Sequence, residues 1–174
     1  MTARPELALL DVRIGEDLAR VEREVAEVAR RIERCQAADP DQDALWLLAK
    51  GLHGFYTGLE AILEKVHEVF FGEAPRGPDS HTRLLQDAAR DVPRVRPPVL
   101  RPQTAEKLYD YLRFRHFFRH AYGVSLDWDR MRGKVLGLAV LHEAVREDLA
   151  RFRRFLQAAV AAPPAEPPPS PPAR

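Results

Sequence analysis

The chain has 174 residues, enough for one domain with a sizeable core. Its 27 lysines and arginines almost balance its 26 aspartates and glutamates, so the net charge of +1 does not by itself indicate a nucleic-acid partner. A single cysteine excludes an intramolecular disulfide. We see neither the apolar run of a signal peptide nor a stretch long enough to span a bilayer, and therefore expect a soluble, cytoplasmic protein.

Two long amphipathic helices are predicted in the first half of the chain. From Pro5 to Cys35, apolar side chains recur every three or four residues, with arginine and glutamate between them. Asp39 and Pro40 then form a break, after which a second helix of the same periodicity runs from Pro40 to Phe71. Each pattern is typical of one helix in a bundle. For the first helix, a coiled-coil seam for a partner is the alternative.

The second helix carries glycines at positions 51, 54 and 58. Each costs up to about 1 kcal/mol relative to alanine in a helix, so we interpret them as a face that another backbone approaches closely, most simply that of the fourth helix. A kink is the alternative. His53, Tyr56 and Glu60 share one face of this helix and are candidates for supporting the basic strip defined below or a dimer contact. Ordinary surface or boundary positions are the competing interpretation.

A short helix and a proline-rich connector follow. The loop Gly72–Ser80 is rich in glycine and proline, and Asp79 or Ser80 can cap a helix that extends to about Ala89. The segment Asp91–Gln103 holds four prolines and three arginines and is predicted to be extended. Its arginines either contact a phosphate backbone or lie in a solvated linker; they are Arg94, Arg96 and Arg101.

The fourth helix contains the most unusual stretch of the sequence. It is predicted to begin with Thr104 as its N-cap and to run to Tyr122, with Gly123 at the C-terminal cap position. At about 100° per residue, one arc of this helix is aromatic and is expected in the core. Its members are Phe114, Phe117 and Phe118. The opposite arc, called the basic strip here, consists of Arg113, Arg115, His116, Arg119 and His120.

A fifth helix is predicted from about Asp127 to Val160. We therefore expect an all-α fold, an up-and-down helical bundle of four long helices plus one short helix. Residues 1–160 would form this helical domain, and residues 161–174, rich in proline, a disordered tail.

The basic strip suits phosphate chemistry. Arginine presents a planar fork of donors that matches phosphate oxygens, and histidine exchanges a proton near neutral pH. An imidazole that assists attack by a ribose 2′-OH and a guanidinium that stabilises charge on phosphorus would cleave RNA without a metal. A solvated polar face is the plain alternative. Metal binding by His116 and His120 is another, and it would need a third ligand.

The segment Arg115–Tyr122, RHFFRHAY, resembles the motif of the HEPN superfamily, and within it that of the HepT-like ribonuclease toxins. That motif is an arginine, a polar residue, three further positions, a histidine and, two residues later, a tyrosine. The segment His53–Val66 is similar to the second helix of the same family, and the resemblance covers roughly Ala44 to Phe155.

The resemblance implies an endoribonuclease toxin of a toxin–antitoxin pair, with RNA as its substrate and no cofactor. It also implies a homodimer whose shared cleft holds two copies of Arg115 and His120, and a minimal nucleotidyltransferase antitoxin that attaches AMP to Tyr122. The alternatives are a non-catalytic helical subunit that binds substrate or nucleotide for a nucleotidyltransferase, and a structural bundle protein that binds no RNA.

Each member of the basic strip has an expected role. His120 is the general acid and base, and Arg115 stabilises the transition state. His116 supports the proton transfer, while Arg119 and Arg113 position phosphates.

Overall fold

The computed structural model describes residues 4–35, 39–120 and 125–162, and the elements that it contains within these ranges are all helices, apart from one isolated pairing of two residues. They are α1 (Arg4–Arg34), α2 (Gln42–Phe71), α3 (Ser80–Ala88), α4 (Pro102–Arg119) and α5 (Trp128–Ala161). The predicted all-α fold of four long helices and one short one is confirmed. No helix among the described residues combines the length and the apolar content that crossing a membrane requires.

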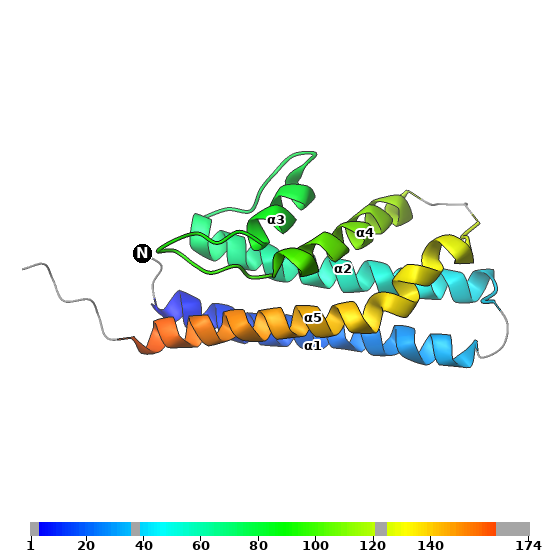
Figure 1. Cartoon of the computed structure of the whole chain (residues 1–174), viewed down its shortest axis with the longest axis horizontal. Helices are drawn as coiled ribbons and strands as arrows, with labels where there is room; N and C mark the ends of the chain where they lie inside the picture. Colours follow the sequence, from blue (N-terminus) through cyan, green and yellow to red (C-terminus); the bar gives the residue numbers. More distant parts are fainter. Residues whose placement is uncertain (1–3, 36–38, 121–124, 163–174) are drawn as a thin grey trace, which may run out of the picture.

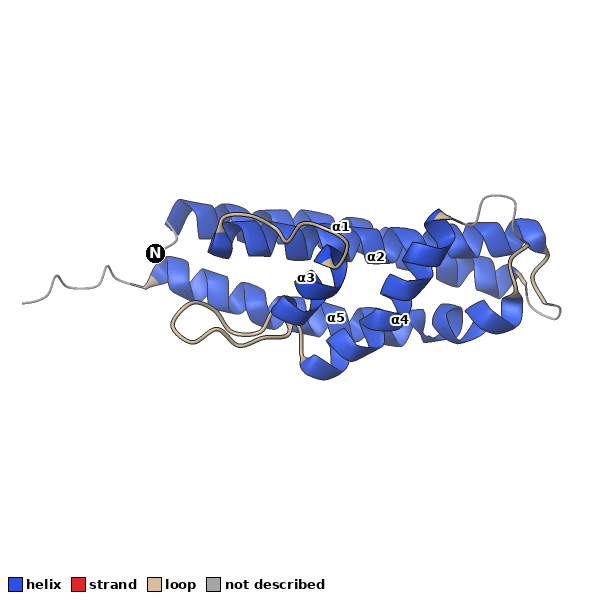
Figure 2. Ribbon diagram, turned by 90° about the horizontal axis from the view of Figure 1, so that it is seen from above, coloured by secondary structure: helices blue, strands red, loops and turns tan. Residues whose placement is uncertain are grey.

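The four longer helices form an elongated up-and-down bundle (Figures 1 and 2). Helix α1 packs against α2 and α5. Helix α4 packs against α2, α3 and α5, so it completes the bundle on the side of α2 that α3 also covers. The end of α5 returns to the same end of the bundle as the start of α1, while the end of α4 and the start of α5 lie at the opposite end (Figure 1).

The core runs along the whole bundle because the apolar stripes of its helices face one another. Ile14 of α1, Phe55 of α2 and Phe152 of α5 are completely buried in one continuous cluster. Burying a side chain of this size stabilises the fold by about 1.5–3 kcal/mol, so the three- and four-residue periodicity of the sequence accounts for the architecture.

The glycines of α2 pack against α1. A Cβ atom added to Gly51 would lie 2.3 Å from Cγ2 of Val28, and one added to Gly58 would lie 2.7 Å from Cγ2 of Val21. The predicted close approach of another helix is therefore confirmed. The prediction that this helix is the fourth one is wrong, because the helix that approaches is α1. Valine, which is β-branched, has few rotamers to move away from an added methyl group.

Helix α4 begins earlier than predicted. Its N-cap is Arg101 with Pro102 in the first turn, and Thr104 is buried inside the helix rather than capping it. The start is held by Asp148 of α5, which is completely buried. Its carboxylate accepts a hydrogen bond from the backbone N–H of Arg101 at 2.9 Å and lies 2.6 Å from Nε of the same residue. Arg101 therefore has a structural role at the start of α4, whichever of the two interpretations of the connector applies.

The connector before α4 turns back on itself instead of staying extended. Val92 and Arg96 form an isolated antiparallel bridge. The buried guanidinium of Arg96 donates to the carbonyl oxygens of Asp87 at 2.7 Å and Arg90 at 3.2 Å, which lie at the end of α3. An arginine that satisfies the last carbonyls of a helix is a structural anchor, so Arg96 is not a phosphate contact.

The end of α4 also differs from the prediction. The helix ends at Arg119, and the N–H of its C-cap residue His120 bonds to the carbonyl of Phe117 at 3.0 Å, which tightens the last turn. Tyr122 and Gly123 lie outside the described residues, as does the proline-rich tail from residue 163. Helix α5 begins where predicted, with Asp127 as its N-cap, and the side chain of Asp127 accepts a bond from the N–H of Asp129 at 2.9 Å.

Candidate functional site

The basic strip is divided between two sides of α4. Arg115 follows the core-facing residues Leu108 and Tyr111 at spacings of three and four, so its side chain turns toward α2 and is only 11% exposed. His116 and His120 lie on the solvent side of the helix. The basic strip is therefore not a single arc opposite the core, because Arg115 occupies a position of the helix that faces the bundle.

Arg115 is held by α2. Its Nη2 lies 2.8 Å from Oε2 of Glu60, a carboxylate that is itself buried, and its Nε donates to Oγ1 of Thr57 at 3.4 Å. A pair of this kind between a guanidinium and a carboxylate is stronger than a neutral hydrogen bond and fixes the plane of the guanidinium. The suggestion that Glu60 supports the basic strip is thus confirmed for Arg115. Thr57 carries no sequence signal beyond its place one turn before Glu60.

Glu60 has a second neighbour in α3. Nδ1 of His81 lies 2.7 Å from Oε1 of Glu60, although the two groups are not aligned as a hydrogen bond. A single buried carboxylate therefore lies between a guanidinium of α4 and an imidazole of α3. The pKa values of Glu64 and Tyr56 are both raised, first by burial and next by the negative charge of Glu60. His81 is not among the residues that we assigned to this site from the sequence.

His53 of α2 lies beside the same arginine. Its ring meets that of Phe118 edge to face, with centroids 5.5 Å apart, and Nδ1 lies 3.2 Å from Oγ1 of Thr57. Partial burial, followed by the charges of Arg115 and Arg119, lowers the pKa of His53. At neutral pH this imidazole is therefore uncharged, so it adds no positive charge beside Arg115 and Arg119.

The two outward histidines form a pair. The ring centroids of His116 and His120 are 4.8 Å apart, and Nδ1 of His120 lies 2.8 Å from the carbonyl oxygen of His116. Because a carbonyl oxygen only accepts, Nδ1 of His120 must donate this bond. The neutral ring consequently carries its lone pair on Nε2, which is the atom that a general base uses.

The remaining arginines of the basic strip are exposed. Arg113 is paired with Asp110 at 2.6 Å, and Arg119 is the last residue of α4. Among the described residues, no hydrogen bond or ring contact joins Arg115 to His120, and their five-residue separation directs the two side chains about 140° apart around the helix axis. Within the same ranges, no three His, Cys, Asp or Glu side chains come together as a metal site, which leaves the His116–His120 pair without a third ligand.

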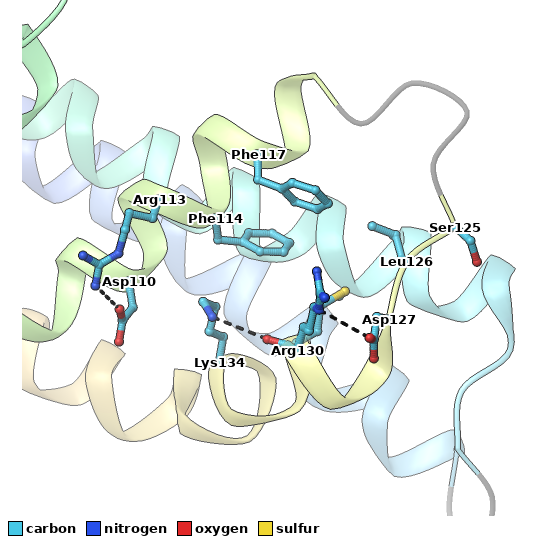
Figure 3. Close-up of a pocket in the computed structure, with 10 residues that line it drawn as sticks. Asp110, Arg113, Phe114, Phe117, Ser125, Leu126, Asp127, Arg130 and Lys134 are labelled. Carbon is cyan, nitrogen blue, oxygen red and sulfur yellow. Dashed lines mark hydrogen bonds and ion pairs between the residues drawn. The ribbon is translucent and has the colours of Figure 1, made fainter.

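A pocket of about 290 Å³ lies between α4 and the start of α5 (Figure 3). Phe117 reaches into it and is 47% exposed, so the prediction that this phenylalanine belongs to the core is wrong. Phe114, in contrast, is buried beneath the pocket. The lining residues are Asp110, Arg113, Phe114, Phe117, Ser125, Leu126, Asp127, Arg130, Met131 and Lys134.

A helical bundle that carries an arginine and a histidine at the spacing of Arg115 and His120 is typical of one class of proteins. Comparison of the sequence with family models finds the same class. The model of the HepT-like protein family matches residues 47–156, a span that includes nearly all of α2, the whole of α3 and α4 and most of α5. The chain therefore belongs to the HepT-like family of the HEPN superfamily, which confirms the predicted resemblance. No curated protein and no solved structure matches the chain.

Proposed function

We propose that the protein is an endoribonuclease toxin of a toxin–antitoxin pair and that it cleaves RNA without a metal ion. The observation that carries the proposal is the state of His120, whose Nδ1 is bonded to the carbonyl of His116 so that Nε2 is the basic atom of an exposed ring. Membership in the HepT-like family supports the same assignment.

In the proposed reaction, Nε2 of His120 takes the proton of the ribose 2′-OH. The 2′ oxygen attacks phosphorus, the bond to the 5′ oxygen breaks, and an imidazolium returns a proton to that leaving oxygen. The products are a 2′,3′-cyclic phosphate and a 5′-hydroxyl. Arg115 stabilises the charge that develops on the phosphorane oxygens, His116 supports the proton transfer, and Arg113 and Arg119 position the neighbouring phosphates.

A homodimer makes this division of labour workable. Within one protomer the guanidinium of Arg115 faces α2 whereas the ring of His120 faces solvent, and a second protomer facing the same helix would supply a second arginine and a second imidazole to one cleft. Two cationic faces repel each other, so bound RNA or another anion would favour the pairing.

The proposed regulation acts on Tyr122, two residues after His120 in the chain. A minimal nucleotidyltransferase antitoxin would attach AMP to this phenol, which adds bulk and negative charge beside the phosphate site. Coexpression with such a partner is expected to increase the intact mass by one adenylate, carried by the peptide that contains Tyr122. Inhibition without that increase would mean that the antitoxin masks the site instead.

The proposal is tested by incubating the purified protein with labelled RNA in the presence of a metal chelator. The parent should yield cyclic phosphate ends. His120→Ala should lower the cleavage rate by at least about a hundredfold, because general acid–base catalysis contributes roughly 10²–10⁴-fold. Lys107→Ala, which removes an exposed cation near the start of the same helix, serves as the control and should cleave like the parent. Equal cleavage by all three proteins would refute the assignment.

One observation favours a second function, that of a non-catalytic subunit that binds substrate or nucleotide for a nucleotidyltransferase. Arg115 already pairs with Glu60 and is largely covered, which suits an arginine with a structural role. Under this function the unmodified protein would bind RNA or nucleotide in the chelator experiment and leave the RNA intact.

A further inference from the structure

Of the residues that line the pocket between α4 and α5, the proposed reaction uses Arg113 alone, and Phe117 on the pocket wall lies between the two histidines in the sequence. We propose that this pocket binds a base of the RNA, the one next to the phosphate that is cleaved. The inference rests on the proposed function and adds to it the site that holds the substrate.

The aromatic wall of the pocket provides a stacking surface. Phe117 exposes about half of its side chain, and its ring lies 6.4 Å from that of the buried Phe114, which supports it from below. Proteins that bind single-stranded RNA stack bases on such exposed rings, and every base offers a face for this contact. An exposed phenylalanine that only filled space would not need a hollow in front of it.

The size of the pocket selects a small ligand. Its volume of about 290 Å³ is at the lower end of the range for small-molecule sites, roughly 300–1,000 Å³. One planar base fits this space better than a folded segment of another protein does. Leu126 and Met131, which are both buried, close the apolar floor on the side of α5.

The rim of the pocket suits the sugar–phosphate chain attached to that base. Arg113, Arg130 and Lys134 contribute three cations, against the two carboxylates of Asp110 and Asp127. Arg113 is paired with Asp110 at 2.6 Å and Arg130 with Asp127 at 3.5 Å, whereas the ammonium of Lys134 has no carboxylate partner among the described residues and makes a long bond of 3.5 Å to the carbonyl of Arg130. One net positive charge thus remains for a phosphate, and the carboxylates can accept bonds from the amino group of a base.

The position along α4 connects the pocket to the chemistry. Phe117 directly follows His116 and precedes His120 by three residues, a separation of about 4.5 Å along the helix axis. A base stacked on Phe117 therefore brings the phosphate beside it to the side of the helix on which the two histidines lie.

The test measures binding and cleavage separately. Affinity is measured by fluorescence anisotropy with the inactive His120→Ala protein and a labelled single-stranded RNA, and again with the same RNA carrying abasic sites. Replacing Phe117 by Ala in this background should weaken binding of the normal RNA by roughly five- to a hundredfold, and Phe117→Trp should preserve it. The control is Leu136→Ala, which removes an exposed apolar side chain of α5 outside the pocket. The abasic RNA should bind equally weakly to the His120→Ala protein and to the same protein with Phe117→Ala added.

Three results would overturn the inference. The first is unchanged affinity when Phe117→Ala is added to the His120→Ala protein. The second is equal binding of the normal and the abasic RNA by the His120→Ala protein. The third is a Phe117→Ala protein that loses its dimer in light scattering without RNA, since the pocket would then be a contact between subunits. Failure of the proposed function is seen independently, as RNA that the unsubstituted protein leaves intact. Unchanged affinity together with normal cleavage would overturn only the base pocket.

Discussion

At the scale of single residues, the direction of the Arg115 guanidinium depends on Glu60. This carboxylate is buried, bonds to Arg115 at 2.8 Å and has His81 as its other neighbour, so helices α2, α3 and α4 meet at one charged group. A guanidinium held in this way cannot swing freely, and a transition state that needs it is served by a group already in place.

Replacing Glu60 by Gln is expected to lower kcat for RNA cleavage by roughly ten- to a hundredfold, because the amide keeps the shape but no longer holds the guanidinium by charge. KM should change much less, since the exposed cations that meet the RNA are untouched. Steady-state kinetics on a short RNA give both values. Glu68→Gln, an exposed glutamate two turns further along α2, is the control. An unchanged kcat in a folded Glu60→Gln protein would show that Glu60 serves stability alone.

The identity of these residues could be predicted from the sequence better than their surroundings. The motif was visible as a pattern, and Glu60 stood on the correct face of α2. The partial burial of Arg115 could not be seen, since a charged residue on a helix is expected to face water, and only the contact with α2 shows that it does not. The exposure of Phe117 was missed for the converse reason: an aromatic residue on an apolar arc is expected inside.

At the scale of elements, the glycine face of α2 determines how closely α1 can approach. Gly51→Ala should lower the free energy of unfolding by about 1–2 kcal/mol: crowding against Val28 costs roughly 1–3 kcal/mol, and the better helix propensity of alanine returns up to about 1 kcal/mol. Denaturant unfolding measures the difference. Gly133→Ala in α5, where an added Cβ meets nothing within 4 Å, is the matched control and should be stabilised by up to about 1 kcal/mol. Stabilisation of both variants would contradict the close packing.

Periodicity predicted the five helices because apolar spacing is a local property of the chain. The ends of α4 were not predicted because they depend on other contacts. Thr104 looked like a cap, but Asp148, far along the chain in α5, holds the backbone of Arg101 and starts the helix there. At the other end, a bond from the N–H of His120 to the carbonyl of Phe117 closes the helix before the glycine that suggested its end.

At the scale of the whole molecule, two partly buried histidines make stability depend on pH. Burial lowers the pKa of His53, with a further contribution from Arg115 and Arg119, and burial also lowers the pKa of His142, whose Nε2 is buried without a partner among the described residues. Below the ordinary histidine value of 6.5, these two positions therefore bind more protons in the unfolded chain than in the folded protein.

The free energy of unfolding should accordingly decrease as the pH falls from about 7 through the lowered pKa values, and these two residues should add no pH dependence above that range. Urea unfolding at a series of pH values measures the slope. The double variant His53→Gln, His142→Gln should show a shallower decrease than the parent. A slope identical to that of the parent would mean that the two imidazoles do not carry this effect.

The close packing of α1 on α2 also bears on where a domain of this kind can be cut. The family match begins at residue 47, inside α2, and leaves out α1 altogether. Yet valine side chains of α1 fill the groove that the glycines leave along α2, and the apolar side chains of α1 belong to the same core. The region that matches the family model is thus shorter than the region that shares one hydrophobic core. A relative without a counterpart of α1 must cover that groove with another helix or with a second subunit, and the glycines of α2 mark the place.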